Sequence, residues 1–227
     1  VGLDDSQDIL ARSAQRWQID LPEATLRELA DSAHGSPFRL RELADEFRPC
    51  GALAEIVSAD DSVSALSQVD QLWQRRAERL SDDAKKVLPF VVTAGGRVST
   101  QQLGELSGLK DSVDAAISEL AHQRLITDEA TGGECIAIFH DHVADEMFSK
   151  LSEELKARSH HAWASMLVRQ DNPDRLAARI AGHFFAAGEP GRAVAHAILA
   201  AEDAERRVAK SEAARWYRRV IEHVQGD

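Results

Sequence analysis

A short apolar run that ends in a His-Asp pair constrains the fold of this chain more than any other stretch. Residues 136–142 read Ile-Ala-Ile-Phe-His-Asp-His, so a strand-like run gives way to the start of an amphipathic helix. The patterns before it predict two small helical units, and the patterns after it predict stacked helices. Asp141 is a predicted N-cap, because its carboxylate can accept hydrogen bonds from the free N–H groups of the first turn. Taken alone, His140 at such a junction is more often structural than a ligand.

The composition predicts a globular protein of two or three small domains. The chain has 227 residues, of which 44% are hydrophobic and 29% are charged. Its formal net charge is −11, which disfavours binding to nucleic acid and to anionic membranes. No apolar run reaches the roughly 18 residues of a membrane span. We therefore expect a cytoplasmic protein with Cys50 and Cys135 as free thiols. The start at Val1 instead of Met indicates a piece of a longer protein.

Residues 1–50 predict a compact unit of three helices. Apolar residues recur at helical spacing from Ser6 to Trp17, and Pro22 begins a second amphipathic helix. Gly35 follows that helix where a left-handed cap is expected, and Pro37 stands in the first turn of a third helix. On this reading alone, Gly35 and Pro37 only separate two helices.

The next residues, 51–66, predict a polar linker, and residues 67–153 predict a winged-helix domain. The order of its elements is helix, strand, helix, helix and a two-stranded hairpin with a glycine-containing tip. Serine and aspartate mark the helix starts, because their side chains can accept a hydrogen bond from the first turn. The markers, in chain order, are Ser81 as an N-cap, Gly95-Gly96 as a break, Arg97-Val98 as a short strand, Ser99 with Gln102 as a capping box, Asp111 or Ser112 as an N-cap, and Leu125–Thr127 with Cys135–Phe139 as the hairpin.

Residues 154–227 predict antiparallel helices of the tetratricopeptide (TPR) kind. Helical spacing recurs over residues 176–187, 190–207 and 211–224, with short joints between them. Small residues alternate with aromatic ones in these segments. Packing small against aromatic side chains lets stacked helix pairs close a core that one pair cannot close. The predicted fold class for the whole chain is therefore mainly α.

Two short motifs, His34-Gly35-Ser36-Pro37 and Phe139-His140-Asp141, resemble those of signal-transduction ATPases of the STAND class, which are related to AAA proteins. Residues 34–43, His-Gly-Ser-Pro-Phe-Arg-Leu-Arg-Glu-Leu, resemble the GxP segment of that class's helical lid. Phe139-His140-Asp141 resembles the MHD motif of its winged-helix domain, with Phe139 in place of Met. Residues 80–84 and 160–163 also stand where the class has the opening of the winged helix and the helix that leads into repeats. The order of these motifs is similar to that in large LuxR-type bacterial regulators and in bacterial Ser/Thr kinase–ATPase fusions.

The resemblance implies a nucleotide-switched role. In that class the proline of the lid lies against the adenine, and the histidine contacts the β-phosphate of bound ADP. It therefore implies that Pro37 and His140, with Gly35 and Asp141 beside them, are cofactor-binding residues for ADP or ATP with Mg²⁺. Such binding is expected only in the intact parent protein, where an upstream P-loop domain holds the nucleotide.

The chain by itself lacks the residues for catalysis. A P-loop requires G-x-x-x-x-G-K-[ST], and no Gly-Lys pair occurs in the sequence. No G-x-S-x-G signature marks a nucleophile, and His140, His142, Asp145 and Glu146 do not complete a metal site. We therefore expect no catalytic residues, no metal and no enzyme activity in this chain. The activity of the parent, ATPase or Ser/Thr kinase, stays open.

The function inferred from these features is regulatory. The lid and the winged helix close over nucleotide held upstream, and the repeats bind a protein partner or inhibit in cis. One alternative is a DNA-binding winged helix, but its recognition helix, residues 110–119, and its wing, residues 128–134, are acidic. Another is a protein-interaction scaffold whose sensor residues no longer act. A basic cluster on the last helices indicates a solvated face or, as the less favoured reading, a docking surface: Arg206, Arg207, Lys210, Arg215, Arg218 and Arg219.

Overall fold

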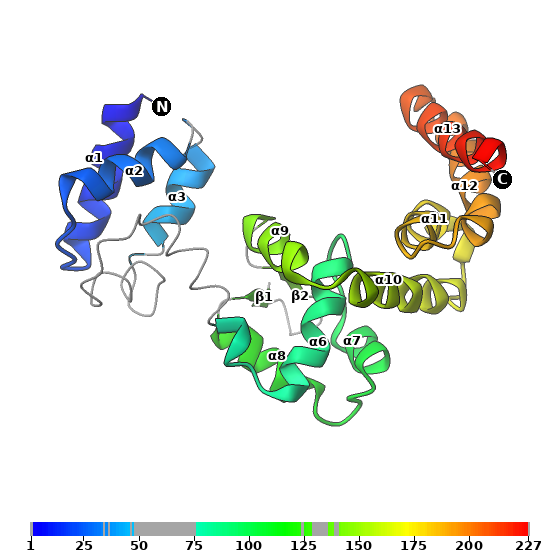
Figure 1. The fold of residues 1–227 in the computed structure, drawn as a ribbon, viewed down its shortest axis with the longest axis horizontal. Coiled ribbons are helices and arrows are strands. Elements are labelled where there is room, and N and C mark those ends of the chain that lie inside the picture. The colour runs from blue at the N-terminus through cyan, green and yellow to red at the C-terminus, as the bar shows by residue number, and fades with distance from the viewer. Residues whose placement is uncertain are drawn as a thin grey trace. The chain divides into compact units, whose positions relative to one another are not determined.

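The structure of the chain is a computed structural model that describes residues 2–33, 35, 37–45, 47, 76–123, 125–128, 136–138 and 141–226. These residues are mainly helical with one two-stranded sheet, so the predicted mainly α fold class is confirmed. The chain divides into two compact units, Val1–Arg79 and Leu80–Asp227, and each is considered by itself (Figure 1). The predicted linker, residues 51–66, lies outside the described residues.

The described residues from 2 to 47, in the first unit, form three short helices, as predicted (Figure 1). They are α1 (Leu3–Arg16), α2 (Glu23–Ser32) and α3 (Pro37–Asp45), and α1 packs against both of the others. Apolar residues that predicted these helices are buried between them: Leu10, Ala14, Leu29, Ala30, Ala33, Leu40 and Phe47. Helix α1 starts at Leu3, before the range from Ser6 to Trp17 that the apolar spacing predicted, and the Ser6 hydroxyl donates to the Gly2 carbonyl at 2.8 Å.

The second unit begins with three helices whose starts follow the capping signals. These helices are α6 (Asp82–Thr93), α7 (Thr100–Ser107) and α8 (Val113–His122). Ser81 Oγ accepts a hydrogen bond from the Ala84 N–H at 3.2 Å, which confirms the predicted N-cap of α6. Ser99 and Gln102 form the predicted capping box at the start of α7, each side chain bonding to the backbone of the other.

A small hairpin follows these helices. Strands β1 (Ile126–Asp128) and β2 (Ile136–Ile138) pair antiparallel, in the order predicted. The strand predicted at Arg97-Val98 is only a single bridge, in which Val98 and Ile136 exchange backbone hydrogen bonds of 2.9 and 2.7 Å. It cannot extend, because the chain turns at Gly96 just before it and the Ser99 cap begins α7 just after it. That these elements form a winged helix stays a prediction.

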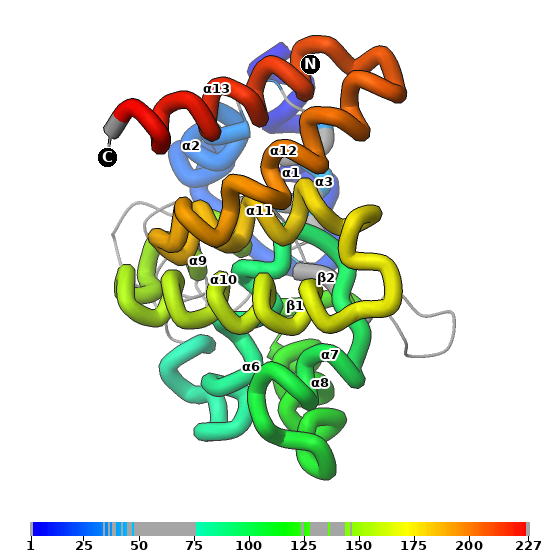
Figure 2. Tube along the Cα trace, turned by 90° about the vertical axis from the view of Figure 1, so that its right-hand side faces the viewer, coloured from blue at the N-terminus to red at the C-terminus, as the bar shows by residue number. Residues whose placement is uncertain are grey.

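The described rest of the second unit is helical, and from its second helix onward each helix packs against the next. These helices are α9 (Asp141–Lys150), α10 (Glu153–Val168), α11 (Ala177–Ala186), α12 (Pro190–Arg206) and α13 (Lys210–Gly226), with the 3₁₀ turn η1 (Pro173–Leu176) before α11. Helix α10 lies beside α11, α11 beside α12, and α12 beside α13 (Figure 2). The last three match the predicted helical segments to within a few residues.

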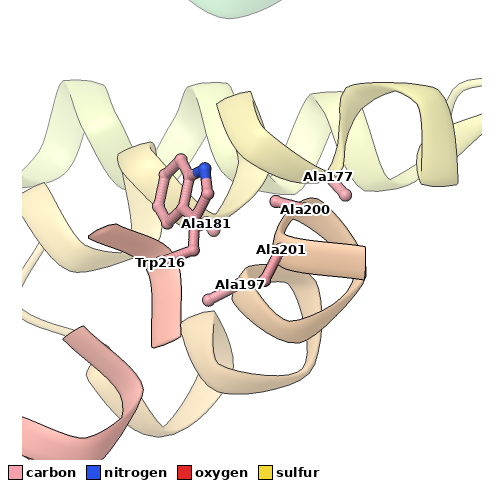
Figure 3. Close-up of a cluster of buried hydrophobic side chains, with 6 residues drawn as sticks. All are labelled: Ala177, Ala181, Ala197, Ala200, Ala201 and Trp216. Carbon is pink, nitrogen blue, oxygen red and sulfur yellow. The ribbon is translucent and has the colours of Figure 1, made fainter. Parts of the chain in front are cut away.

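Helices α11, α12 and α13 share a core built largely from alanine. Figure 3 shows the Trp216 ring of α13 among Ala177 and Ala181 of α11 and the alanines of α12. Small residues let the helix backbones approach closely, and the one large ring fills the space between them. This is the small-against-aromatic packing that the sequence predicts, although the name TPR-like stays a prediction.

Candidate functional site

Two of the predicted nucleotide-contacting residues, Gly35 and Pro37, lie in the first unit. Gly35 has a φ of 71°, the left-handed conformation predicted for it. Pro37 is the first residue of α3, as predicted. Both residues are exposed, so neither fills the core of this unit. Their role beside an adenine stays a prediction.

The other two predicted residues belong to the junction between β2 and α9. His140 is outside the described residues. Asp141 was predicted to be the N-cap of this helix, but it is the first residue of α9, one position further along. It therefore lies in the first turn, where a carboxylate complements the helix dipole. Both β2 and α9 pack against α6, which anchors the junction from either side.

A buried tryptophan connects α10 to α6, the helix against which β2 and α9 also pack. Trp163 of α10 is fully buried, and its indole N–H donates to the Phe90 carbonyl of α6 at 2.9 Å. Phe90 is among the last four residues of α6, whose carbonyls have no partner within the helix, so the indole satisfies a group that would otherwise be orphaned. Arg169 adds an exposed ion pair with Glu105 of α7 at 2.8 Å. Helix α10 is thereby attached to both α6 and α7.

Two histidines meet where α10 contacts α11. His160 Nδ1 and His183 Nδ1 are 2.9 Å apart, so one ring donates to the other. The His183 ring stacks on Trp163 with 6.0 Å between centroids, and Phe148 of α9 meets the His160 ring edge-on. Burial, together with the charges of His160 and Arg179, lowers the pKa of His183 to about 4, and burial also lowers the pKa of His160. Both rings are therefore neutral near pH 7.

The histidine pair does not make a metal site by itself, because a bound metal needs more protein ligands. In the parts of the chain that the structure describes, no three His, Cys, Asp or Glu side chains are grouped to hold a metal ion. Sequence reasoning missed the pair, since no local pattern links His160 to His183. The one local signal is the adjacent pair His160-His161, which stands in the segment that resembles the helix leading into the repeats.

A group of polar side chains also connects α10 to the joint between α11 and α12. His161 Nδ1 contacts Glu189 Oε1 in that joint, and Arg192 donates to the other Glu189 oxygen at 2.8 Å. These hydrogen bonds hold the pKa of Glu189 below its ordinary value. Ser165 Oγ lies 3.4 Å from His161 Nε2, so the order Ser-His-Glu matches that of some serine hydrolases. However, His161 is exposed and the Ser165 contact is at the limit of a hydrogen bond, so the arrangement supports packing, not catalysis.

Helix α8 would be the recognition helix of a DNA-binding domain. One of its acidic side chains forms hydrogen bonds within the second unit. Glu119 accepts hydrogen bonds from both the backbone N–H and the hydroxyl of Ser81. Ser112 occupies the predicted N-cap position of α8, but its hydroxyl donates to Asp83 at 3.3 Å, and the predicted capping bond is not formed. A carboxylate acceptor makes that alternative bond charge-assisted. These contacts tie α8 to the start of α6.

Comparison of the chain with protein-family models, with curated proteins and with solved structures gives no match. Within the described ranges, no helix is both long enough and apolar enough to cross a membrane.

Proposed function

We propose that the chain is a regulatory, non-catalytic part of a nucleotide-switched signalling ATPase of the STAND class. The three-helix unit acts as a lid, and the region from α6 to α9 acts as a winged helix. Both close over ADP or ATP that an upstream P-loop domain holds with Mg²⁺ in the cytoplasm. Pro37 and His140 contact the nucleotide, with Gly35 and Asp141 beside them. The helices from α10 onward are TPR-like repeats that carry the state of the switch to a protein partner.

The observation that best supports this proposal is the attachment of α10. The bond from Trp163 to the Phe90 carbonyl fixes α10 to α6, which also carries β2 and α9. Helix α10 packs along α11, the first of the stacked helices beyond it. A displacement of α6 on nucleotide exchange would therefore move α10 and the helices stacked on it. Coupling of this kind needs a packed element that both regions share.

The coding sequence on the N-terminal side of Val1 is the first test. We expect it to encode G-x-x-x-x-G-K-[ST] after a strand, with a second strand that ends in acidic residues, because these hold the phosphates and Mg²⁺. A parent protein without a P-loop would refute the proposal.

The relay is tested in the parent with Trp163→Phe, which keeps an aromatic ring and removes the indole donor. In the wild type, we expect ADP to change the rate of amide hydrogen exchange in α6–α9 and also in α11–α13. In the variant, the change in α11–α13 should become smaller, while the change in α6–α9 should remain. Trp216→Phe is the matched control, since its buried indole N–H donates to none of the described residues and so loses no hydrogen bond among them. A wild type whose response to ADP stops at α9 would contradict the relay, as would equal losses in both variants.

A further inference from the structure

The arginines at the end of the chain fall into two sets with different partners. In the first set, Arg206 donates to Asp203 at 3.1 Å and Arg207 donates to the same carboxylate at 2.9 Å. Arg207 also reaches Glu212 at 3.3 Å. Nearby carboxylates therefore neutralise the charge of this first set.

The second set, Arg215 and Arg219 of α13, lies over aromatic rings. The guanidinium carbon of Arg219 is 4.2 Å from the Phe185 ring centroid and 5.8 Å from that of Trp216. The guanidinium carbon of Arg215 is 5.5 Å from the Trp216 centroid. Among the described side chains, neither arginine forms an ion pair with a carboxylate, and the same holds for the neighbouring Arg218.

The rings hold these guanidinium groups in position. Trp216 is only 5% exposed and is packed among alanines of α11 and α12 (Figure 3). This packing restricts the rotamers that its side chain can adopt. Phe185 packs against the same cluster. A guanidinium that lies over a ring keeps its N–H donors in its own plane, where they can still bind a carboxylate through two hydrogen bonds. Arg215 and Arg219 are thus donors held near aromatic rings, and none of the described carboxylates forms an ion pair with them.

We propose that Phe185, Arg215, Trp216, Arg218 and Arg219, named the arginine face, bind an acidic segment of a partner protein. Carboxylates of that segment pair with Arg215 and Arg219, which lie over the rings, and Arg218 adds a third cation on the same helix. The inference rests on the proposed function only in that the repeats dock a protein. The chemistry of the partner follows from the arginine face itself.

A short acidic protein segment fits the arginine face better than a nucleic acid does. Strong binding to duplex DNA uses about six to ten phosphate contacts, whereas this face offers three cations. Acidic residues also border it, because Glu222 follows Arg218 and Arg219 by one turn of α13 and Glu205 interacts with the Tyr217 hydroxyl. A long polyanion would meet these carboxylates, and a short segment would not.

Peptide binding to the 227-residue chain tests the proposal without any nucleotide. The probes are a labelled peptide rich in Glu and Asp, the same peptide with Gln and Asn in their place, and a DNA duplex of similar length. We expect fluorescence anisotropy to show saturable binding of the acidic peptide alone, weakening as salt rises. Failure of the acidic peptide to bind at low ionic strength would overturn the proposal. Equal binding of the amide peptide, or tighter binding of the duplex, would do the same.

Matched arginine variants locate the binding. Arg215→Gln with Arg219→Gln should weaken acidic-peptide binding by about tenfold or more, since both positioned donors are lost. Arg206→Gln with Arg207→Gln removes the same charge from arginines that already have partners, and it should change binding by less than about twofold. Equal losses in the two double variants would assign binding to net charge and refute the arginine face.

A single substitution keeps the test open if the first double variant does not fold. Arg219→Lys retains the charge but loses the planar donor group, so it should weaken binding by about threefold or more. Unchanged binding of the acidic peptide to that variant would contradict recognition by the Arg219 guanidinium. The two proposals can fail separately. If the chain binds the acidic peptide but its parent lacks a P-loop, the proposed function is refuted and the arginine face is supported. If the parent has a P-loop but the chain does not bind the peptide, the arginine face is refuted and the proposed function is supported.

Discussion

Val208 holds a backbone conformation that a β-branched residue rarely adopts. Val208 lies in the joint after α12 and has a φ of 62°. Gly188, in the joint after α11, has a φ of 75°. In both joints the next N–H donates to the carbonyl five residues earlier, at 2.9 Å after Gly188 and at 2.8 Å after Val208. This is the Schellman helix end, which glycine suits best because it has no Cβ to clash. The two joints share a geometry, but only one has the residue that the geometry favours.

Val208→Gly should therefore stabilise the second unit, by up to about 1 kcal/mol. Relief of left-handed strain is worth about 1–2 kcal/mol, and the added freedom of glycine in the unfolded chain removes up to about 1 kcal/mol of that gain. The valine side chain is 74% exposed, so little burial is lost. Urea unfolding of the variant measures the change. Ala209→Gly is the control and should destabilise, because Ala209 has no positive φ; a destabilised Val208→Gly would contradict the strain argument.

At the scale of helices, the contact between α10 and α11 contains an ionisable group that must stay neutral. His183 is 7% exposed, and its pKa of about 4 lies below the ordinary 6.5 of a histidine. Among the described residues, His160 and Arg179 are the charged or titratable groups that shift this pKa, and both oppose protonation. As pH falls, the unfolded chain binds a proton at this histidine before the folded chain does. The contact therefore contributes its full stability above about pH 6.5 and loses it as pH falls toward 4.

This linkage predicts a loss of about 2 kcal/mol in the free energy of unfolding between about pH 7.5 and about pH 5 from His183 alone. Chemical denaturation at the two pH values measures it. In His183→Gln this part of the pH dependence should disappear, while carboxylate titrations remain in both proteins and cancel in the comparison. The exposed His122→Gln serves as the control and should keep the wild-type dependence. Identical pH profiles for His183→Gln and wild type would show that the pair is not linked to folding.

At the scale of the whole molecule, the chain alone should bind ADP weakly or not at all. Most phosphate contacts in a P-loop protein come from the P-loop itself. Pro37 and His140 would leave too few interactions to offset the entropy of association. Calorimetric titration of the 227-residue chain with ADP checks this expectation. Micromolar or tighter binding would contradict it and would place a nucleotide site within the chain.

In the intact parent, His140→Ala should increase basal output without unfolding the chain. A charge-assisted hydrogen bond from His140 to a β-phosphate, made only in the closed state, biases the equilibrium toward that state. Losing roughly 1.5–3 kcal/mol changes the closed-to-open ratio by about tenfold to a hundredfold. Basal output and melting temperature are the measurements.

Asp141→Ala is the comparison for His140→Ala, because Asp141 lies in the first turn of α9. It should lower stability by up to about 1 kcal/mol through the lost helix-dipole contact and leave output unchanged. A His140→Ala parent with wild-type output and a wild-type ADP off-rate would leave His140 as a structural residue.

The sequence by itself determined the features that depend on neighbours within a few residues. The Ser81 cap, the capping box of Ser99 and the left-handed Gly35 follow from backbone groups that the first and last turns of a helix leave unpaired. The helical segments after α10 follow from apolar spacing alone. Where a competing partner lies far away in the sequence, local reasoning failed, as when Ser112 bonded to Asp83 and left α8 uncapped.

Only the tertiary structure decided which distant residues share a contact. Three contacts each join different helices: the bond from Trp163 to Phe90, the pair of His160 and His183, and the cation–π contact of Arg219 with Phe185. The basic cluster looked uniform in sequence, yet packing gave some of its arginines carboxylates and others aromatic rings. Periodicity fixes which face of a helix is buried, but the rotation and offset at which two helices pack fix which side chains meet. Those two quantities depend on the volumes of all the side chains between the helices, and no local pattern contains them.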